Sequence, residues 1–127
     1  MTTILMVEDE MNLAMMLEDI LGDAGYHVLK AARLPKALEL VAQFYLEGEH
    51  RIDAAILDIN LAGVEVFPLA AVLLTRGVPL VFTSGYGKDG IPDKYSDCAV
   101  LQKPYGADSI LSTLQAMIGG PDLALAS

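Results

Sequence analysis

Short apolar runs alternate with longer segments of helical periodicity along this chain. The apolar runs cover residues 4–7, 26–31, 54–57, 80–83 and 99–102. Their length and their flanking polar residues are typical of buried strands. Between them, apolar residues recur three or four positions apart, which predicts helices over residues 11–21, 35–46, 66–75 and 107–118. Strands that alternate with helices predict an α/β fold, with a parallel sheet, right-handed crossovers and helices on both faces.

The chain length and composition fit one domain with one core. The 127 residues are 54% hydrophobic and 20% charged, which is a globular composition. We expect the domain to span residues 1–119 and residues 120–127 to form a disordered tail, because Gly119, Gly120 and Pro121 end the last helix. Glycine, proline and charged residues dominate residues 85–97 and predict a loop with at most a short helical turn.

The net charge of −9 makes several partners unfavourable. An acidic surface repels nucleic-acid phosphates and anionic lipids, so we expect no nucleic-acid and no membrane partner, whereas a cation would be attracted. The chain has no apolar stretch near the roughly 18 residues of a membrane span, and Glu8 and Asp9 come too early for a signal peptide. We therefore expect a cytoplasmic protein. The single cysteine, Cys98, lies in an apolar run and is interpreted as a core residue.

Polar residues follow four of the five predicted strands. A parallel sheet brings the carboxyl ends of its strands to one edge, where such sheets bind ligands. In chain order these residues are Glu8 and Asp9, Asp58 and Asn60, Thr83 and Ser84, and Lys103. Each has an ordinary alternative when taken alone: acids are common at a helix N-terminus or in a turn, Ser-Gly is a frequent turn pair, and most lysines are solvated. The combination is what indicates a site.

This combination of side chains suits phosphoryl transfer. Mg²⁺ prefers oxygen ligands, so Asp9 and Asp58 are candidates for direct contact, Glu8 for contact through water, and Asn60 for contact through its backbone carbonyl. A metal-bound carboxylate can attack phosphorus, which makes Asp58 the candidate nucleophile. Lys103 would neutralise a phosphoryl oxygen and Ser84 would donate a hydrogen bond to another.

The chain resembles the receiver domains of two-component response regulators over nearly its whole length. The motifs are Leu5-Met-Val-Glu-Asp-Glu10, Ile56-Leu-Asp-Ile-Asn-Leu61, Pro79-Leu-Val-Phe-Thr-Ser-Gly85 and Leu101-Gln-Lys-Pro-Tyr105. The resemblance implies a flavodoxin-like sheet of order 2-1-3-4-5, with Asp58 as phosphoacceptor. It also implies a Mg²⁺ site formed by Glu8, Asp9, Asp58 and the Asn60 carbonyl, and a cis peptide at Lys103-Pro104. The switch hydroxyl is placed at Ser84, five residues after Pro79, with Thr83 as the fallback.

Several positions depart from the common receiver pattern. The run Phe82-Thr-Ser-Gly-Tyr-Gly87 resembles a Phe-Ala-Thr-Gly-X-Tyr subgroup of mostly single-domain regulators, in which the fourth helix is short or replaced by a loop. Val100 occupies the position of the usual switch aromatic, so we expect the signal to pass through ordering of residues 85–97. Tyr86 is either a cover for the acyl phosphate or an exposed loop residue. The turn after Asp58, at residues 61–64, is expected to be tighter than usual.

The resemblance implies a regulator that accepts phosphate from a histidine kinase or a histidine phosphotransfer protein. We expect output through a downstream protein of unknown identity or a role as a phosphate sink, in a monomer or weak homodimer. No enzymatic activity is expected beyond self-phosphorylation and autodephosphorylation. Two alternatives were weighed. One is a degenerate receiver that binds partners without phosphorylation. The other is an aspartate-nucleophile phosphatase, which would need a second aspartate where Asn60 stands.

Overall fold

A five-stranded parallel sheet forms the centre of the computed structural model, which describes residues 2–48, 51–86 and 90–118. The sheet order is β2-β1-β3-β6-β7, which is the predicted 2-1-3-4-5 order of a doubly wound, flavodoxin-like fold. The predicted tail at residues 120–127 lies outside the described residues. The strands are β1 (Thr3–Val7), β2 (His27–Ala31), β3 (Ala54–Asp58), β6 (Leu80–Ser84) and β7 (Ala99–Gln102).

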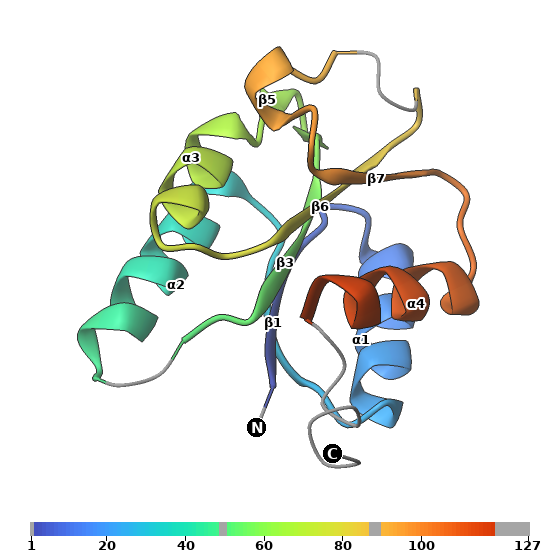
Figure 1. The fold of residues 1–127 in the computed structure, drawn as a ribbon, viewed down its shortest axis with the longest axis horizontal. Coiled ribbons are helices and arrows are strands. Elements are labelled where there is room, and N and C mark those ends of the chain that lie inside the picture. Colours follow the sequence, from blue (N-terminus) through green and yellow to red (C-terminus); the bar gives the residue numbers. More distant parts are fainter. Residues whose placement is uncertain (1, 49–50, 87–89, 119–127) are drawn as a thin grey trace.

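Two helices cover each face of the sheet (Figure 1). Helices α1 (Met11–Asp23) and α4 (Ala107–Ile118) lie on one face, and α2 (Leu34–Leu46) and α3 (Phe67–Thr75) lie on the other. The alternation of side chains along β3 explains the two cores, because Ile56 packs towards α1 and α4 whereas Leu57 packs towards α2 and α3. Within the described ranges, none of the helices has the length and apolar character needed to cross a membrane.

The central strand β3 is buried along its whole length, as expected for a strand covered on both faces. It runs one residue further than predicted, so that Asp58 is its last residue. Ser84 likewise ends β6, while Tyr26 precedes β2. Cys98 is half-buried and packs against the core on the α2 and α3 face, and this burial raises the pKa of its thiol.

A short β-hairpin with two-residue strands follows β3. Its strands are β4 (Asn60–Leu61) and β5 (Val64–Glu65), which pair antiparallel. The turn residues Ala62 and Gly63 both have positive φ, 53° and 87°, as a tight hairpin turn requires. The sequence predicted a tighter turn here but not strand pairing, because two-residue strands are too short to show alternation.

Between β6 and β7, the described residues form one 3₁₀ turn, Asp93–Tyr95, and no α-helix, where the common receiver pattern has the helix before the last strand. This confirms the predicted loss of that helix; residues 87–89 of the predicted loop lie outside the described residues. The second half of the segment is anchored by Tyr95, which is only 1% exposed. Its ring stacks on Phe67 at 5.5 Å between centroids and meets Phe82 edge-on at 5.5 Å.

Candidate functional site

Three carboxylates meet at the carboxyl end of the two central strands. Glu8 and Asp9 follow β1, and Asp58 ends β3. The two strands are paired with Val7 opposite Leu57, which sets Glu8 beside Asp58. Oxygen atoms of the three carboxylates all lie within 4.8 Å of one another. The structure therefore brings together the acids that the sequence analysis had placed at this edge.

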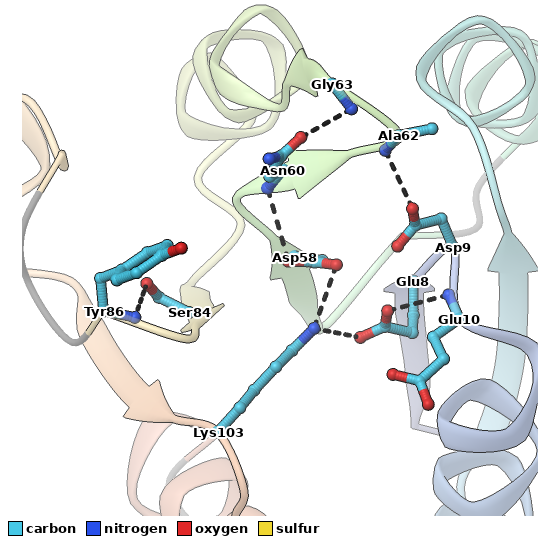
Figure 2. A network of polar contacts seen from close by, with 10 residues as sticks. All are labelled: Glu8, Asp9, Glu10, Asp58, Asn60, Ala62, Gly63, Ser84, Tyr86 and Lys103. Carbon is cyan, nitrogen blue, oxygen red and sulfur yellow. Dashed lines mark hydrogen bonds and ion pairs between the residues drawn. The ribbon is translucent and has the colours of Figure 1, made fainter.

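Lys103 contacts two of these acids (Figure 2). Its Nζ donates a hydrogen bond to Asp58 Oδ2 at 3.1 Å and lies 3.1 Å from Glu8 Oε1 as an ion pair. The base of the lysine is held by a 2.8 Å bond from its own backbone N–H to the Ser84 carbonyl. The peptide bond between Lys103 and Pro104 is cis, as the resemblance implies. The pairing with Glu8 was not predicted, since Glu8 was expected to act through water.

Burial dominates the electrostatics of the paired acids. Removal from water, together with the nearby charge of Asp58, raises the pKa of Glu8 to about 7, against the lowering effects of a bond from the Glu10 N–H and of Lys103. Burial also raises the pKa of Asp58, which Lys103 opposes. For Lys103, burial alone would lower the pKa, but the charges of Asp58 and Glu8 raise it. One lysine thus faces two buried carboxylates, an arrangement that favours a further cation.

The hairpin after β3 fixes the third acid. Asp9 Oδ2 accepts a hydrogen bond from the Ala62 N–H at 2.9 Å, within the turn. Asn60 contributes to the same turn, because its side-chain oxygen accepts a bond from the Gly63 N–H at 2.7 Å. The Asn60 N–H donates a long bond of 3.4 Å to Asp58 Oδ1. The turn therefore connects two of the three carboxylates (Figure 2).

The two candidate hydroxyls lie on opposite faces of the sheet, because they are neighbours on β6. Ser84 lines a hollow of about 240 Å³ that Asp58 also lines. Its Oγ accepts a bond from the Tyr86 N–H at 3.0 Å. Thr83 is buried beside Asp58 across the strand pair and lines no part of this hollow. Asp58 and Ser84 therefore line one hollow, and the assignment of the switch hydroxyl to Ser84 stays a prediction.

Tyr86 lies at the rim of the same hollow, and its side chain is 82% exposed. The ring stands beside Ser84 and does not cover Asp58 (Figure 2). Of the two interpretations of this residue, the exposed loop tyrosine matches the geometry of the structure. A covering role would need the ring to turn inwards.

The donor set fits Mg²⁺. All three clustered side chains are carboxylates, and oxygen is the ligand that this hard cation prefers. Asp9 is half-exposed, so the cluster is open to solvent on one side. Burial raises the pKa of both Glu8 and Asp58, and Lys103 lowers both without cancelling that effect.

Comparisons with known proteins identify the family. No protein-family model and no curated protein sequence matches this chain. Among solved structures, SdrG from Sphingomonas melonis Fr1 is 37% identical, with 93% of this chain and 97% of that chain covered and a TM-score of 0.76. The BeF3-activated conformation of SdrG from Pseudomonas melonis Fr1 is 38% identical, with 91% and 95% covered and a TM-score of 0.72.

A response regulator receiver protein from Burkholderia phymatum shares the fold at 19% identity, with 94% of this chain and 97% of that chain covered and a TM-score of 0.79. The sheet order and the acidic cluster beside Lys103 agree with these likenesses. This chain belongs to the receiver-domain response regulators.

Proposed function

We propose that this chain is a phosphoacceptor receiver, in which Asp58 takes a phosphoryl group from a histidine kinase or a histidine phosphotransfer protein. The observation that carries the proposal is the position of Asp58. Its carboxylate ends the central strand, opens onto the 240 Å³ hollow, and is held by Lys103 Nζ at 3.1 Å. A carboxylate held by a lysine beside further acids matches what phosphoryl transfer to an aspartate requires.

In the proposed step, a carboxylate oxygen of Asp58 attacks the phosphorus of a phosphohistidine. The new P–O bond forms as the P–N bond breaks, and the leaving imidazole keeps the bond electrons and takes up a proton. Oδ1 is the better placed attacking oxygen, because its bond to the Asn60 N–H is long at 3.4 Å, whereas Oδ2 is held by Lys103 at 3.1 Å. The product is an aspartyl phosphate.

Three groups would act on the transferred phosphoryl group. Lys103 would shift its contact from the carboxylates to a phosphoryl oxygen, and Ser84 would donate its hydroxyl hydrogen to another. The Ser84 oxygen already accepts the Tyr86 N–H, which leaves its O–H free to donate. Glu8, Asp9, Asp58 and the Asn60 carbonyl would hold a Mg²⁺ ion, which when bound supplies positive charge that offsets the phosphoryl oxygens.

Output would follow from the state of Asp58. We propose that phosphorylation orders part of residues 85–97, since Ser84 precedes this segment and Val100 offers no aromatic ring to turn inwards. The ordered segment would bind a downstream protein, or the domain would serve as a phosphate sink. Autodephosphorylation would then return the carboxylate: water attacks phosphorus, the P–O bond to Asp58 breaks, and inorganic phosphate leaves.

A labelling experiment tests this proposal. The wild-type protein is incubated with ³²P-acetyl phosphate with and without Mg²⁺, beside Asp58→Asn and the matched control Asp19→Asn, which changes an exposed acid on α1. We expect Mg²⁺-dependent label on the wild type and on Asp19→Asn, and none on Asp58→Asn. Absence of label on the wild type would favour the degenerate receiver and would contradict the proposal.

A further inference from the structure

Three side-chain oxygen atoms are buried without a hydrogen-bond partner in the described part of the chain, and all three belong to residues on the same face of the sheet. They are Glu8 Oε1, Thr83 Oγ1 and the Tyr105 hydroxyl. Glu8, Asp58 and Thr83 stand side by side at the carboxyl ends of β1, β3 and β6. By strand alternation they share the face covered by α1 and α4, against which Tyr105 also packs. Buried polar atoms are normally paired, so this grouping requires an explanation.

Glu8 Oε1 depends on Lys103. The other carboxylate oxygen, Oε2, accepts the Glu10 N–H at 3.1 Å. Oε1 lies 3.1 Å from Lys103 Nζ as an ion pair, and among the described residues no donor makes a well-aligned hydrogen bond to it. The Glu8 side chain is only 2% exposed, so water cannot readily replace the lysine. Loss of a buried charge's partner is costly.

Phosphorylation of Asp58 would weaken the contact between Lys103 and Glu8. Lys103 Nζ lies between Asp58 and Glu8, and the proposed reaction draws it towards an oxygen of the phosphoryl group on Asp58. Such a movement weakens its contact with Glu8. A second donor close to Oε1 would remove the cost of that loss.

Tyr105 is suited to be this second donor. It is two residues from Lys103 in the chain, and its ring packs against the core on the α1 and α4 face. Its hydroxyl is buried and makes no hydrogen bond to any of the residues that the structure describes. Burial, followed by the charges of Glu8 and Asp58, raises the pKa of Tyr105, so the hydroxyl stays protonated near the carboxylates and can donate.

We propose that Tyr105 is a positioning residue: its hydroxyl donates a hydrogen bond to Glu8 Oε1 when Lys103 turns from Glu8 to the phosphoryl group. This inference rests on the proposed phosphoacceptor function of Asp58. It gives the buried hydroxyl, which has no hydrogen-bond partner among the described residues, a partner in the phosphorylated state. Tyr105 would thereby stabilise that state relative to the free one.

Tyr105→Phe separates this role from a structural one. The affinity for beryllium fluoride, a phosphoryl mimic, is measured by calorimetric titration at saturating Mg²⁺, and the free energy of unfolding is measured in urea without Mg²⁺. We expect the affinity to fall about tenfold, the size expected when a buried charge loses one hydrogen bond. The stability of the free protein should stay unchanged or rise, because there the hydroxyl has no partner to lose. The matched control is Tyr26→Phe, at the opposite end of the same face, and it should alter neither quantity.

The outcomes distinguish this inference from the function on which it rests. Unchanged beryllium fluoride affinity in Tyr105→Phe, with normal binding by the wild type, would overturn the role of Tyr105 and leave the proposed function intact. A loss of free-state stability without a change in affinity would also overturn it, because the hydroxyl would then be structural. Failure of the wild type to bind beryllium fluoride with Mg²⁺ would contradict both.

Discussion

At the scale of single residues, the site has one positive side chain, Lys103, in contact with two carboxylates. The lysine faces Glu8 and Asp58 at 3.1 Å each, and both acids are buried. This arrangement depends on the positive charge of Lys103. Without it, two buried carboxylates would repel each other after losing their hydration. The same lysine is therefore expected to matter for stability as well as for phosphoryl transfer.

Lys103→Met tests this double role. We expect the metal-free protein at neutral pH to lose on the order of 2 kcal/mol of unfolding free energy, measured by urea denaturation, and the rate of labelling by acetyl phosphate to fall at least about tenfold. The control Lys36→Met breaks an exposed pair to Glu39 and should cost less than about 0.5 kcal/mol. Equal stability of the two variants would show that Lys103 does not balance the acids.

Tyr86 makes a second prediction at this scale. Its ring is exposed in the free protein, so its removal should leave stability unchanged within about 0.5 kcal/mol. If the ring turns inwards over the acyl phosphate, Tyr86→Ala should speed the loss of label from Asp58 after the donor is removed, because water would reach phosphorus more easily. Tyr86→Phe keeps the ring and should retain the wild-type rate. The same decay rate in all three proteins would leave Tyr86 as an exposed loop tyrosine.

At the scale of elements, the β4–β5 hairpin follows β3 and holds the carboxylate of Asp9 in place. Its turn holds Asp9 through the Ala62 N–H, and its geometry depends on the positive φ of Gly63. Since a Cβ on Gly63 would meet no atom within 4 Å, any cost of a substitution there comes from the backbone alone.

Gly63→Ala should therefore cost about 1 kcal/mol of stability and also weaken Mg²⁺ binding, because Asp9 would lose its donor. The matched control is Gly22→Ala, which also places its Cβ in open space but lies within α1. That change should stabilise the protein by up to about 1 kcal/mol through helix propensity and leave Mg²⁺ affinity unchanged. Urea denaturation and a Mg²⁺ titration measure the two effects. Equal Mg²⁺ affinity in both variants would show that the hairpin turn does not support Mg²⁺ binding.

The 3₁₀ turn is the second informative element. Tyr95 fixes it by packing between Phe67 and Phe82, whereas its hydroxyl bond to the Phe67 carbonyl is long at 3.4 Å. The ring, rather than the hydroxyl, should carry the anchoring energy.

We expect Tyr95→Ala to cost about 3–5 kcal/mol and Tyr95→Phe less than about 1 kcal/mol, both measured by urea denaturation. Limited proteolysis should cut the region around Asp93 in the alanine variant and spare it in the phenylalanine variant. Comparable losses of stability in the two variants would contradict an anchor made by ring packing.

The sequence predicted the long elements well and the short ones poorly, for physical reasons. The five strands and four helices follow from periodicity, and the strand ends placed the acids and Lys103 together. The hairpin was missed because two-residue strands carry no alternation. The anchor Tyr95 was missed because its partners are distant in the sequence. The ion pair between Lys103 and Glu8 was also missed, because the spacing of residues along the chain does not show how far the lysine side chain extends.

At the scale of the whole molecule, topology and charge act together. The crossovers cover both faces of the sheet with helices (Figure 1), and the acids following β1 and β3 lie together at its carboxyl edge. The chain carries 17 acidic and 8 basic residues, and one of those bases, Lys103, stands within the cluster. A protein of this composition attracts cations, and the carboxylate cluster offers them oxygen ligands.

The central claim is that Asp58 accepts the phosphoryl group, and mapping the modified residue tests it most directly. The wild-type protein is treated with acetyl phosphate and Mg²⁺, reduced with borohydride to trap an acyl phosphate, digested and examined by mass spectrometry. We expect the reduced residue at position 58 alone, and its absence when EDTA replaces Mg²⁺. A trapped residue at Glu8 or Asp9, or no trapped residue under conditions that preserve the fold, would contradict the account.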